Sequence, residues 1–184
     1  MRKVFLFMMI SLDGFFEGEN HDLSWHNVDA EFNEFAISQT NNVNTLLFGR
    51  RTYELMADWW PSEHAMTTDP IVAKQMNVKP KMVFSRTLNK ADWSNTKLVK
   101  DNAASEVKKL KNQPGKDIGI YGSNNLCVSL MKDGLVDEFR IMVNPVVIGS
   151  GTPLFAGVQN KVKLKLIKEQ DFKSGNVLLT YHQA

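Results

Sequence analysis

The chain has one cysteine, no cluster of cysteines and histidines, no long apolar run and almost no excess of charge. Cys127 cannot form a disulfide within the chain, and without Cys/His pairs no zinc or other metal site is expected. No run of about 18 apolar residues occurs that would cross a membrane as a helix. With 22 Lys and Arg against 20 Asp and Glu, and no long block of one sign, nucleic acid is not an expected partner. A reducing, cytoplasmic setting fits these absences.

What the chain does contain is the composition of a folded domain. Its 184 residues are 43% hydrophobic and 23% charged, close to globular averages and far from disordered sequences. This length suits a single domain over residues 1–184. The basic start and the apolar run Val4–Ile10 are typical of a secretory signal, but Ser11-Leu12-Asp13-Gly14 follows where a small-residue cleavage site would stand. We therefore expect a strand there.

Strand and helix patterns alternate along most of the chain. Compact apolar runs predict strands at residues 4–12, 44–48, 81–84, 97–99, 118–121 and 138–143. Apolar residues at three- to four-residue spacing predict helices at residues 29–38, 52–56 and 103–110 and from Leu126 to Gly134. Segment 60–79 is weakly patterned and contains Pro70, which predicts a surface excursion with one short helix.

The C-terminal part has a different pattern from the rest. Segments 162–172 and 177–182 predict two strands, and Ser174-Gly175-Asn176 supplies a tight turn between them. The predicted fold class is therefore α/β: three layers, with a mainly parallel central sheet, helices on both faces and an antiparallel C-terminal hairpin.

Two predicted strands end in glycine and enter a helix, at Gly49 and at Gly122. Ligands of open α/β sheets collect at the carboxyl ends of strands, and free amides at helix starts attract phosphate. Either corner alone is more often just a tight turn. Arg50 and Arg51 follow the first corner, and Ser85-Arg86 ends a third strand. Guanidinium groups beside a hydroxyl suit a phosphate monoester such as the 2′-phosphate of NADP.

An ordered set of motifs carries a resemblance to a known family: SLDG, LLFGRRTYE, VFSR, IYGSNNL, GLVDEFRI and PVVIGSGTPLF, starting at Ser11, Leu46, Val83, Ile120, Gly134 and Pro145. Together they resemble the dihydrofolate-reductase-like superfamily. They are most similar to the reductase domain of the bifunctional riboflavin-biosynthesis deaminase/reductase and to its stand-alone bacterial relatives. The zinc deaminase signature is absent, so only reductase chemistry is expected.

The resemblance implies NADPH as cofactor, laid across the strand ends. Motif matching implies that cofactor phosphates are held by Gly49, Arg50, Arg51 and Thr52, and the 2′-phosphate by Ser85 and Arg86. It also implies pyrophosphate contacts from Gly122, Ser123, Asn124 and Leu126, and contacts near the nicotinamide or substrate from Val147, Ile148, Gly149 and Gly151.

Asp29 and Asp13 are the candidate catalytic residues, and Glu31 is weighed beside Asp29. Dihydrofolate reductases place a carboxylate shortly after a Trp, and Asp29 and Glu31 follow Trp25, although neither clearly reproduces the family spacing. Asp29 is equally well explained as a helix cap. Asp13 has a structural explanation, as part of a turn at a strand end, and a functional one, as a polar group that faces the substrate.

The leading hypothesis is an NADPH-dependent oxidoreductase that transfers a hydride to a small heterocycle. The nearest named reaction is reduction of 5-amino-6-(5-phosphoribosylamino)uracil in riboflavin biosynthesis. One alternative is dihydrofolate reduction, and another is an NADPH-binding protein without turnover. Sheet edges left by the C-terminal strands, together with the resemblance, predict a homodimer.

Overall fold

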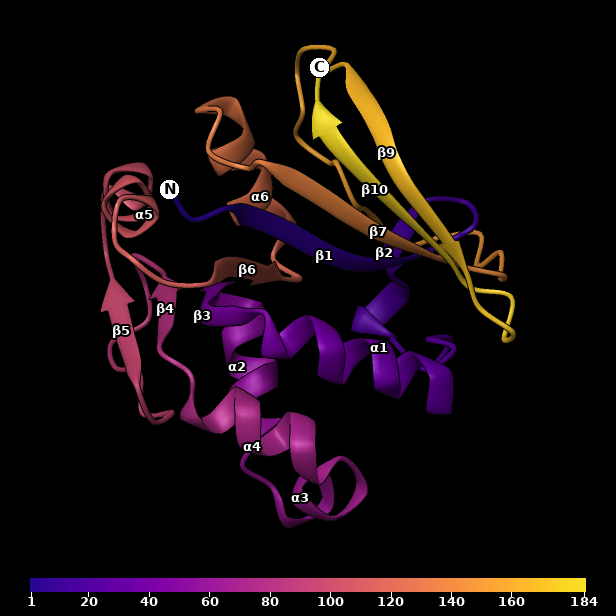
Figure 1. Cartoon of the computed structure of the whole chain (residues 1–184), viewed down its shortest axis with the longest axis horizontal. Helices are drawn as coiled ribbons and strands as arrows, with labels where there is room; N and C mark the ends of the chain where they lie inside the picture. The colour runs from indigo at the N-terminus through magenta and orange to yellow at the C-terminus, as the bar shows by residue number, and fades with distance from the viewer.

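An eight-stranded sheet forms the centre of the computed structural model, which describes residues 1–184 (Figure 1). Its strands are β1 Val4–Ser11, β3 Val43–Gly49, β4 Lys81–Phe84, β5 Thr96–Val99, β6 Asp117–Tyr121, β7 Glu138–Asn144, β9 Leu164–Asp171 and β10 Val177–Gln183. They lie in the order β5-β4-β3-β6-β1-β7-β10-β9. All neighbours are parallel from β5 to β7, and the last two strands are antiparallel. The predicted parallel sheet and C-terminal hairpin are confirmed.

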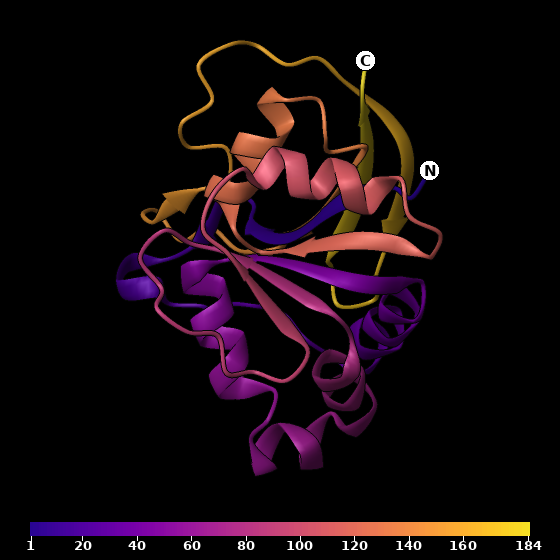
Figure 2. The same ribbon diagram turned by 90° about the vertical axis from the view of Figure 1, so that its left-hand side faces the viewer.

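Helices cover both faces of this sheet (Figure 2). They are α1 Ala30–Asn41, α2 Arg50–Trp59, α3 Glu63–Thr68, α4 Pro70–Val78, α5 Ala103–Lys111 and α6 Asn124–Lys132, with a short 3-10 helix η1 at Glu19–His21. Helices α1, α2 and α4 lie on one face, and α5 and α6 lie on the other (Figure 2). The three-layer α/β architecture is therefore confirmed. No helix is both long enough and apolar enough to cross a membrane.

Strand β1 shows why the sheet is parallel and buried. It lies between β6 and β7, with Leu6 opposite both Ile120 and Phe139. Its side chains alternate between the two faces, yet nearly all are apolar, because each face is covered by helices.

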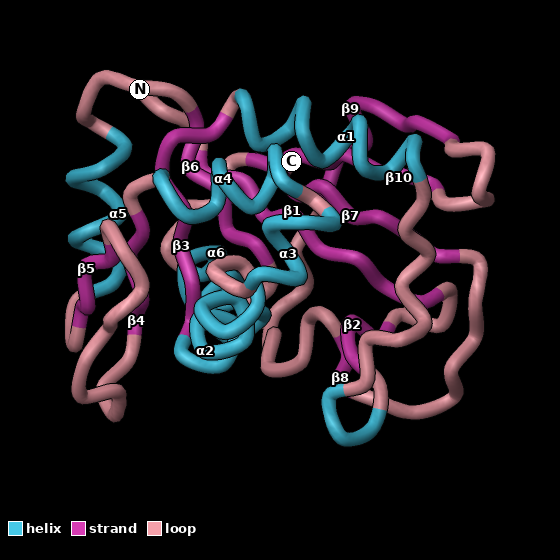
Figure 3. Tube along the Cα trace, turned by 90° about the horizontal axis from the view of Figure 1, so that it is seen from below, coloured by secondary structure: helices cyan, strands magenta, loops and turns pink.

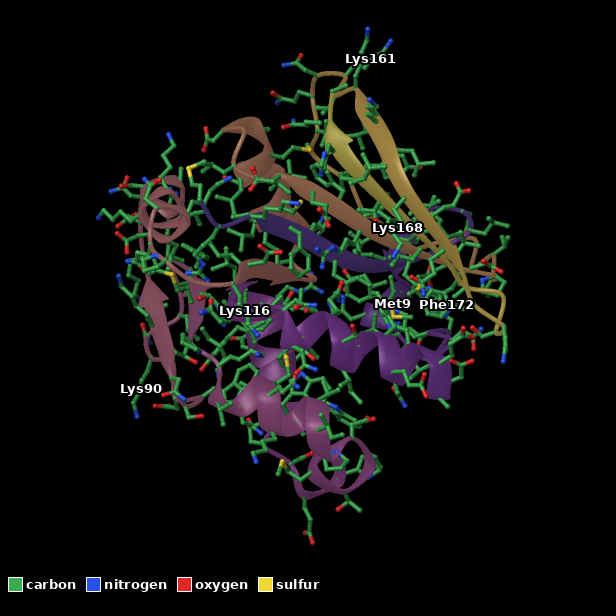
Figure 4. All side chains as sticks on the ribbon, in the orientation of Figure 1. Met9, Lys90, Lys116, Lys161, Lys168 and Phe172 are labelled. Atoms are coloured by element: carbon green, nitrogen blue, oxygen red, sulfur yellow. The ribbon has the colours of Figure 1, made fainter.

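Two hydrophobic cores result from this arrangement. Val4, Leu6 and Met8 join the core under α5 and α6. The core under α1, α2 and α4 contains Phe5, Phe7 and Met9, and Phe172 from the hairpin turn closes its end near Met9 (Figure 4).

Two features of the fold differ from the sequence-based expectation. The segment before Lys79 forms two helices, α3 and α4, and α4 buries Val72, Ala73 and Met76, so it belongs to the core and is not a surface excursion. The second difference is a small sheet of β2 Phe15–Glu17 with β8 Thr152–Pro153, which lies beside the main sheet (Figure 3). Strands of three and two residues carry too little periodicity to be predicted.

Candidate functional site

The two glycine corners are in contact with each other. The backbone amide of Gly49, at the end of β3, donates a hydrogen bond to Ser123 Oγ at the start of α6, at 2.7 Å. A Cβ on Gly49 would lie 3.4 Å from that oxygen, and a Cβ on Gly122 would lie 3.0 Å from the Thr52 side chain. Gly122 also has a φ of +69°, which favours glycine. The positive φ and the tight contact with Thr52 therefore favour glycine at position 122, whereas a side chain at position 49 would make only an ordinary contact with Ser123.

The helices that leave these corners diverge. Strands β3 and β6 are parallel neighbours, but α2 packs on one face through Tyr53 and α6 packs on the other through Leu126. Adjacent parallel strands whose connections leave toward opposite faces open a crevice at their carboxyl ends, where α/β proteins bind ligands. Neither Gly49 nor Ser123 caps its helix through a side chain, although the amide of Asn125 in α6 donates to Asn124 Oδ1 at 2.8 Å. Two positive helix ends at one crevice favour an anionic ligand.

Arg50 and Ser85 lie together on one side of this crevice. Arg50 Nη1 donates to Thr87 Oγ1 at 2.8 Å, and its Nε donates to Glu54 at 2.8 Å. Ser85 Oγ accepts from the amide of Leu88 at 2.9 Å. The structure thus brings the first arginine of α2 to the end of β4, where the sequence placed a monoester site.

Arg86 takes a different position from its neighbours. Its side chain is 86% exposed and its Nε lies 3.7 Å from Asp101, which is also exposed. In this structure Arg86 is therefore not gathered with Arg50.

Arg51 lies on the other side of α2, against a buried carboxylate that the sequence did not reveal. Glu17 is only 6% exposed. It accepts from Thr152 Oγ1 at 2.8 Å, and its other oxygen lies 3.2 Å from His21 Nδ1 and 3.5 Å from Arg51. Gly151 packs so closely that a Cβ there would lie 2.1 Å from the Glu17 carbonyl. These contacts tie the start of α2 to the segment around Thr152.

Asp13 holds the glycine-rich loop that follows β7. Its carboxylate accepts from the amides of Ile148 at 3.2 Å and Gly149 at 2.8 Å. The pKa of Asp13 is lowered, first by a hydrogen bond with the Ser11 side chain and also by these amides. Asp13 is thus a carboxylate at neutral pH, which accepts hydrogen bonds and does not donate a proton. Ser11 also accepts from Gly14 N through its carbonyl, which confirms the predicted turn.

Asp29 caps α1. Its Oδ1 accepts from the amide of Phe32 at 2.8 Å, and its Oδ2 makes no hydrogen bond within the protein. Glu31 accepts from the amide of Lys173 at 2.9 Å, so this acid is used to hold the hairpin turn. Each of the two acids therefore keeps one carboxylate oxygen without a hydrogen bond in the protein, Oδ2 of Asp29 and Oε1 of Glu31.

A buried asparagine network fixes the segment before α1. Asn27 N donates to Asn144 Oδ1 at 2.9 Å, and Asn176 Nδ2 donates to the Asn27 carbonyl at 2.8 Å. Asn144 and Asn176 are fully buried. The network holds Trp25 and His26 beside the end of β7, and burial lowers the pKa of His26 to about 4, with Asp22 opposing the shift. His26 is therefore a neutral imidazole in the folded protein.

Two grooves in the surface lie away from this crevice. One, of about 610 Å³, lies at the amino ends of the strands beside Arg2 and Lys81. Lys81 is not free there, because its ammonium donates to three backbone carbonyls. The other, of about 550 Å³, lies between α1 and the C-terminal hairpin.

Comparison with known proteins identifies the family to which this chain belongs. The model of the RibD C-terminal domain matches residues 2–178. The chain belongs to the RibD C-terminal domain family. It is also similar to the uncharacterized protein YyaP of Bacillus subtilis (strain 168), with 38% identity over 183 residues, which cover 98% of this chain and 95% of YyaP.

Solved structures agree with that family. A putative riboflavin biosynthesis protein from Shewanella sp. PV-4 superposes with a TM-score of 0.75 and 23% identity, covering 99% of each chain. A second similar structure, from Thermotoga maritima, is a diaminohydroxyphosphoribosylaminopyrimidine deaminase/5-amino-6-(5-phosphoribosylamino)uracil reductase. Its TM-score is 0.71 and its sequence identity 14%, and the match covers 100% of this chain and 57% of that one. Dihydrofolate reductase from Enterococcus faecalis, complexed with NADP(H), has a TM-score of 0.65 and a sequence identity of 15%, and the match covers 98% of this chain and 96% of that one. The dihydrofolate-reductase-like fold is confirmed.

Proposed function

We propose that this protein is an NADPH-dependent reductase that transfers a hydride to a small heterocyclic substrate. The nearest named reaction is reduction of 5-amino-6-(5-phosphoribosylamino)uracil, which the Thermotoga maritima protein carries in its name. The observation that supports this most is the hydrogen bond from Gly49 N to Ser123 Oγ. It makes a single crevice of two helix amino ends, which is the arrangement that an extended dinucleotide needs.

The residues at the crevice fit the pyrophosphate of such a cofactor. Glycine at both corners leaves the backbone without a side chain, and a Cβ on Gly122 would lie 3.0 Å from the Thr52 side chain. The amides at the start of α2, including Thr52, and those of Asn124 and Leu126 in α6 are the proposed donors. When bound, NADPH supplies the hydride, and the protein supplies binding and orientation.

The preference for NADPH over NADH is assigned to the side of the crevice at β4. Arg50, Ser85 and Thr87 gather there, and guanidinium with hydroxyl groups suits a phosphate monoester. Arg86 would join them by leaving Asp101, an exposed pair that is worth at most about 1 kcal/mol.

The substrate is placed on the side of the loop that Asp13 holds, with Ile148, Gly149 and Gly151 toward the reacting ring. Asp13 orients this loop as a carboxylate acceptor. Asp29, through its free Oδ2, is the proposed group that holds a substrate N–H or a proton on it. Both roles are part of the proposal and go beyond the motif match.

The assembly is proposed to be a cytoplasmic homodimer. Strand β9 ends the sheet, and Leu164, Leu166 and Ile167 are 36%, 42% and 45% exposed on it. Apolar side chains on an edge strand favour cover by another chain. Lys161, before this strand, projects outward at the edge of the molecule (Figure 4). Light scattering of the purified protein measures the oligomeric state directly.

Titration with NADPH and NADH, followed by an oxidation assay, tests the function. We expect preferential NADPH binding and NADPH oxidation with the aminouracil ribose phosphate. Turnover with dihydrofolate alone, inhibited by methotrexate, would favour the dihydrofolate reductase alternative. Binding without turnover on any heterocycle would favour a binding protein, and no binding of either nucleotide at millimolar concentration would overturn the proposal.

A further inference from the structure

A buried arginine without an acidic partner lies at the amino ends of the parallel strands. Arg2 is only 6% exposed, and its guanidinium donates to three neutral groups, which are the Lys116 carbonyl at 2.6 Å, Thr45 Oγ1 at 2.7 Å and Asn44 Oδ1. Burial lowers the pKa of Arg2, with the attraction of Asp117 opposing the shift. Because buried charges are normally paired, an anion that contacts Arg2 would stabilise the folded protein.

One nitrogen of this guanidinium remains free. The three hydrogen bonds use Nε and Nη2, so Nη1 has no partner in the protein. Nη1 is not among the buried atoms that lack a partner, and Arg2 lines the groove of about 610 Å³. The rest of the guanidinium is fixed by its bonds, so Nη1 offers its two hydrogens as a pre-formed donor to an anion that enters the groove.

The walls of this groove are cationic. Lys97 from β5 and Lys109 from α5 both line it, and both donate to Glu106, at 2.6 and 2.8 Å. These two bonds, that of Lys109 first, lower the pKa of Glu106 to about 2. Glu106 is the only acid among the lining residues, so three cations against one acid leave a formal excess of two positive charges. Lys81, whose ammonium is held by backbone carbonyls, adds to the positive potential.

From this geometry we propose that the groove binds a small phosphate monoester, with Arg2, Lys97 and Lys109 as donors to the phosphate. A phosphate monoester carries nearly two negative charges at neutral pH, which matches the excess charge of the groove. Guanidinium and ammonium groups suit its oxygens. The groove has the volume of a small-molecule site, and Gln113, whose side chain makes no hydrogen bond in the protein, lines it and can bind a sugar hydroxyl.

This groove is separate from the crevice proposed for NADPH. The two lie toward opposite ends of β3, where Thr45 lines the groove and Gly49 ends the strand at the crevice. Four steps along a strand span about 13 Å, so both sites can be filled at once. Binding in the groove therefore does not depend on the proposed function.

Calorimetry with ribose 5-phosphate as the probe, with and without saturating NADPH, tests the site. We expect saturable binding at millimolar concentration in both cases, and none with ribose. The double variant Lys97→Gln, Lys109→Gln should bind about tenfold more weakly, because two charge-assisted contacts to phosphate are lost. The matched control is Lys108→Gln, Lys132→Gln, which removes two exposed charges outside the groove and should bind as wild type. Arg2→Lys should also weaken binding, because an ammonium does not reproduce the planar donor group.

Thermal melting checks the folding of each variant, and the exposed lysines decide the test if Arg2→Lys does not fold. Absence of saturable binding, or equal affinity in the lysine variant and its matched control, would overturn the inference. Displacement of the probe by NADPH, with weaker binding in Arg50→Ala, would place the phosphate at the crevice and overturn it as well. Equal affinity for succinate would reject the phosphate assignment. If NADPH does not bind but the probe responds to Lys97 and Lys109, the proposed function fails and this site stands.

Discussion

Gly49 donates its amide hydrogen to the hydroxyl of Ser123, a residue 74 positions later in the chain, at 2.7 Å. Ser123 has a φ of +64°, a left-handed conformation that costs a non-glycine residue about 1–2 kcal/mol. The hydrogen bond offsets part of that cost by fixing the side chain between the two corners. Strain of this kind collects where a backbone must present its amides to a ligand.

Two substitutions at position 123 separate the strain from the hydrogen bond. Ser123→Ala keeps the strain and loses the bond, and we expect it to lower the free energy of unfolding by about 1 kcal/mol. Ser123→Gly loses the bond but relieves the strain, so its stability should lie closer to wild type. Both should weaken NADPH binding. Urea unfolding and fluorescence titration measure the two effects, and wild-type affinity in both variants would contradict the prediction.

Arg50 should decide between the two nicotinamide cofactors. We expect Arg50→Ala to weaken NADPH binding about tenfold, a loss typical of one charge-assisted contact to phosphate, with little effect on NADH. The ratio of the two dissociation constants is the measurement. Glu54→Gln, which removes the helical partner of Arg50, is the control and should leave the ratio unchanged. An equal loss for both cofactors would move the monoester site elsewhere.

Asp29 can be tested as a cap and as a catalytic group separately. Asn replaces Asp well at a helix N-cap, whereas Ala costs about 1 kcal/mol there. We expect Asp29→Asn to keep the melting temperature and to lower kcat about 100-fold, within the usual range for a lost acid–base group. Asp29→Ala should lower both. Full turnover in Asp29→Asn would leave Asp29 as a cap only.

Stability should fall in mild acid because of His26. Its pKa is about 4 in the folded protein against an ordinary value of 6.5, so between these values the unfolded chain binds more protons than the folded one. Stability is then lost as the pH falls, by about 1 to 2 kcal/mol from pH 7 to pH 5. His26→Gln should lose this part of the pH dependence in urea unfolding. His64→Gln, at an exposed position, should retain it.

Lys81 should be needed for stability despite its charge. Its ammonium donates to the carbonyls of Met76, Asn77 and Lys79 at the end of α4, at 2.8, 3.1 and 2.8 Å, and lies over Trp93. Lys81→Met leaves those carbonyls without donors, so we expect a loss of about 2–3 kcal/mol in urea unfolding. Lys90→Met, at an exposed position (Figure 4), should change stability little.

Most of the main sheet could be predicted from the sequence because its strands are buried on both faces. Val4 to Ser11 and Leu46 to Phe48 are almost wholly apolar, and glycine ends two of the strands. Such apolar runs indicate a strand buried on both faces, even when the residues that pack against it are unknown. The glycine corners were visible for the same local reason, although their contact was not.

The parts that could not be predicted depend on distant contacts. Glu17 is buried because Thr152, 135 residues later, donates to it, and no local pattern distinguishes it from a surface acid. Helix α4 similarly buries Val72 and Met76 against strands formed elsewhere in the chain, so tertiary packing overrides its weak periodicity. The motif match predicts Arg51 at the cofactor phosphates, whereas its pairing with Glu17 depends on the fold.

The position of β6 has a consequence for synthesis. This strand, Asp117–Tyr121, lies between β1 and β3, which are made far earlier. A nascent chain that ends before residue 117 therefore contains β1 and β3 but not the strand that lies between them. The backbone hydrogen-bonding groups of β1 and β3 that pair with β6 are then unpaired. Such a chain cannot form the middle of the sheet, and it lacks Ser123, which contacts Gly49 at the crevice. Both the middle of the sheet and the binding site should thus appear late and together, once α6 has left the ribosome.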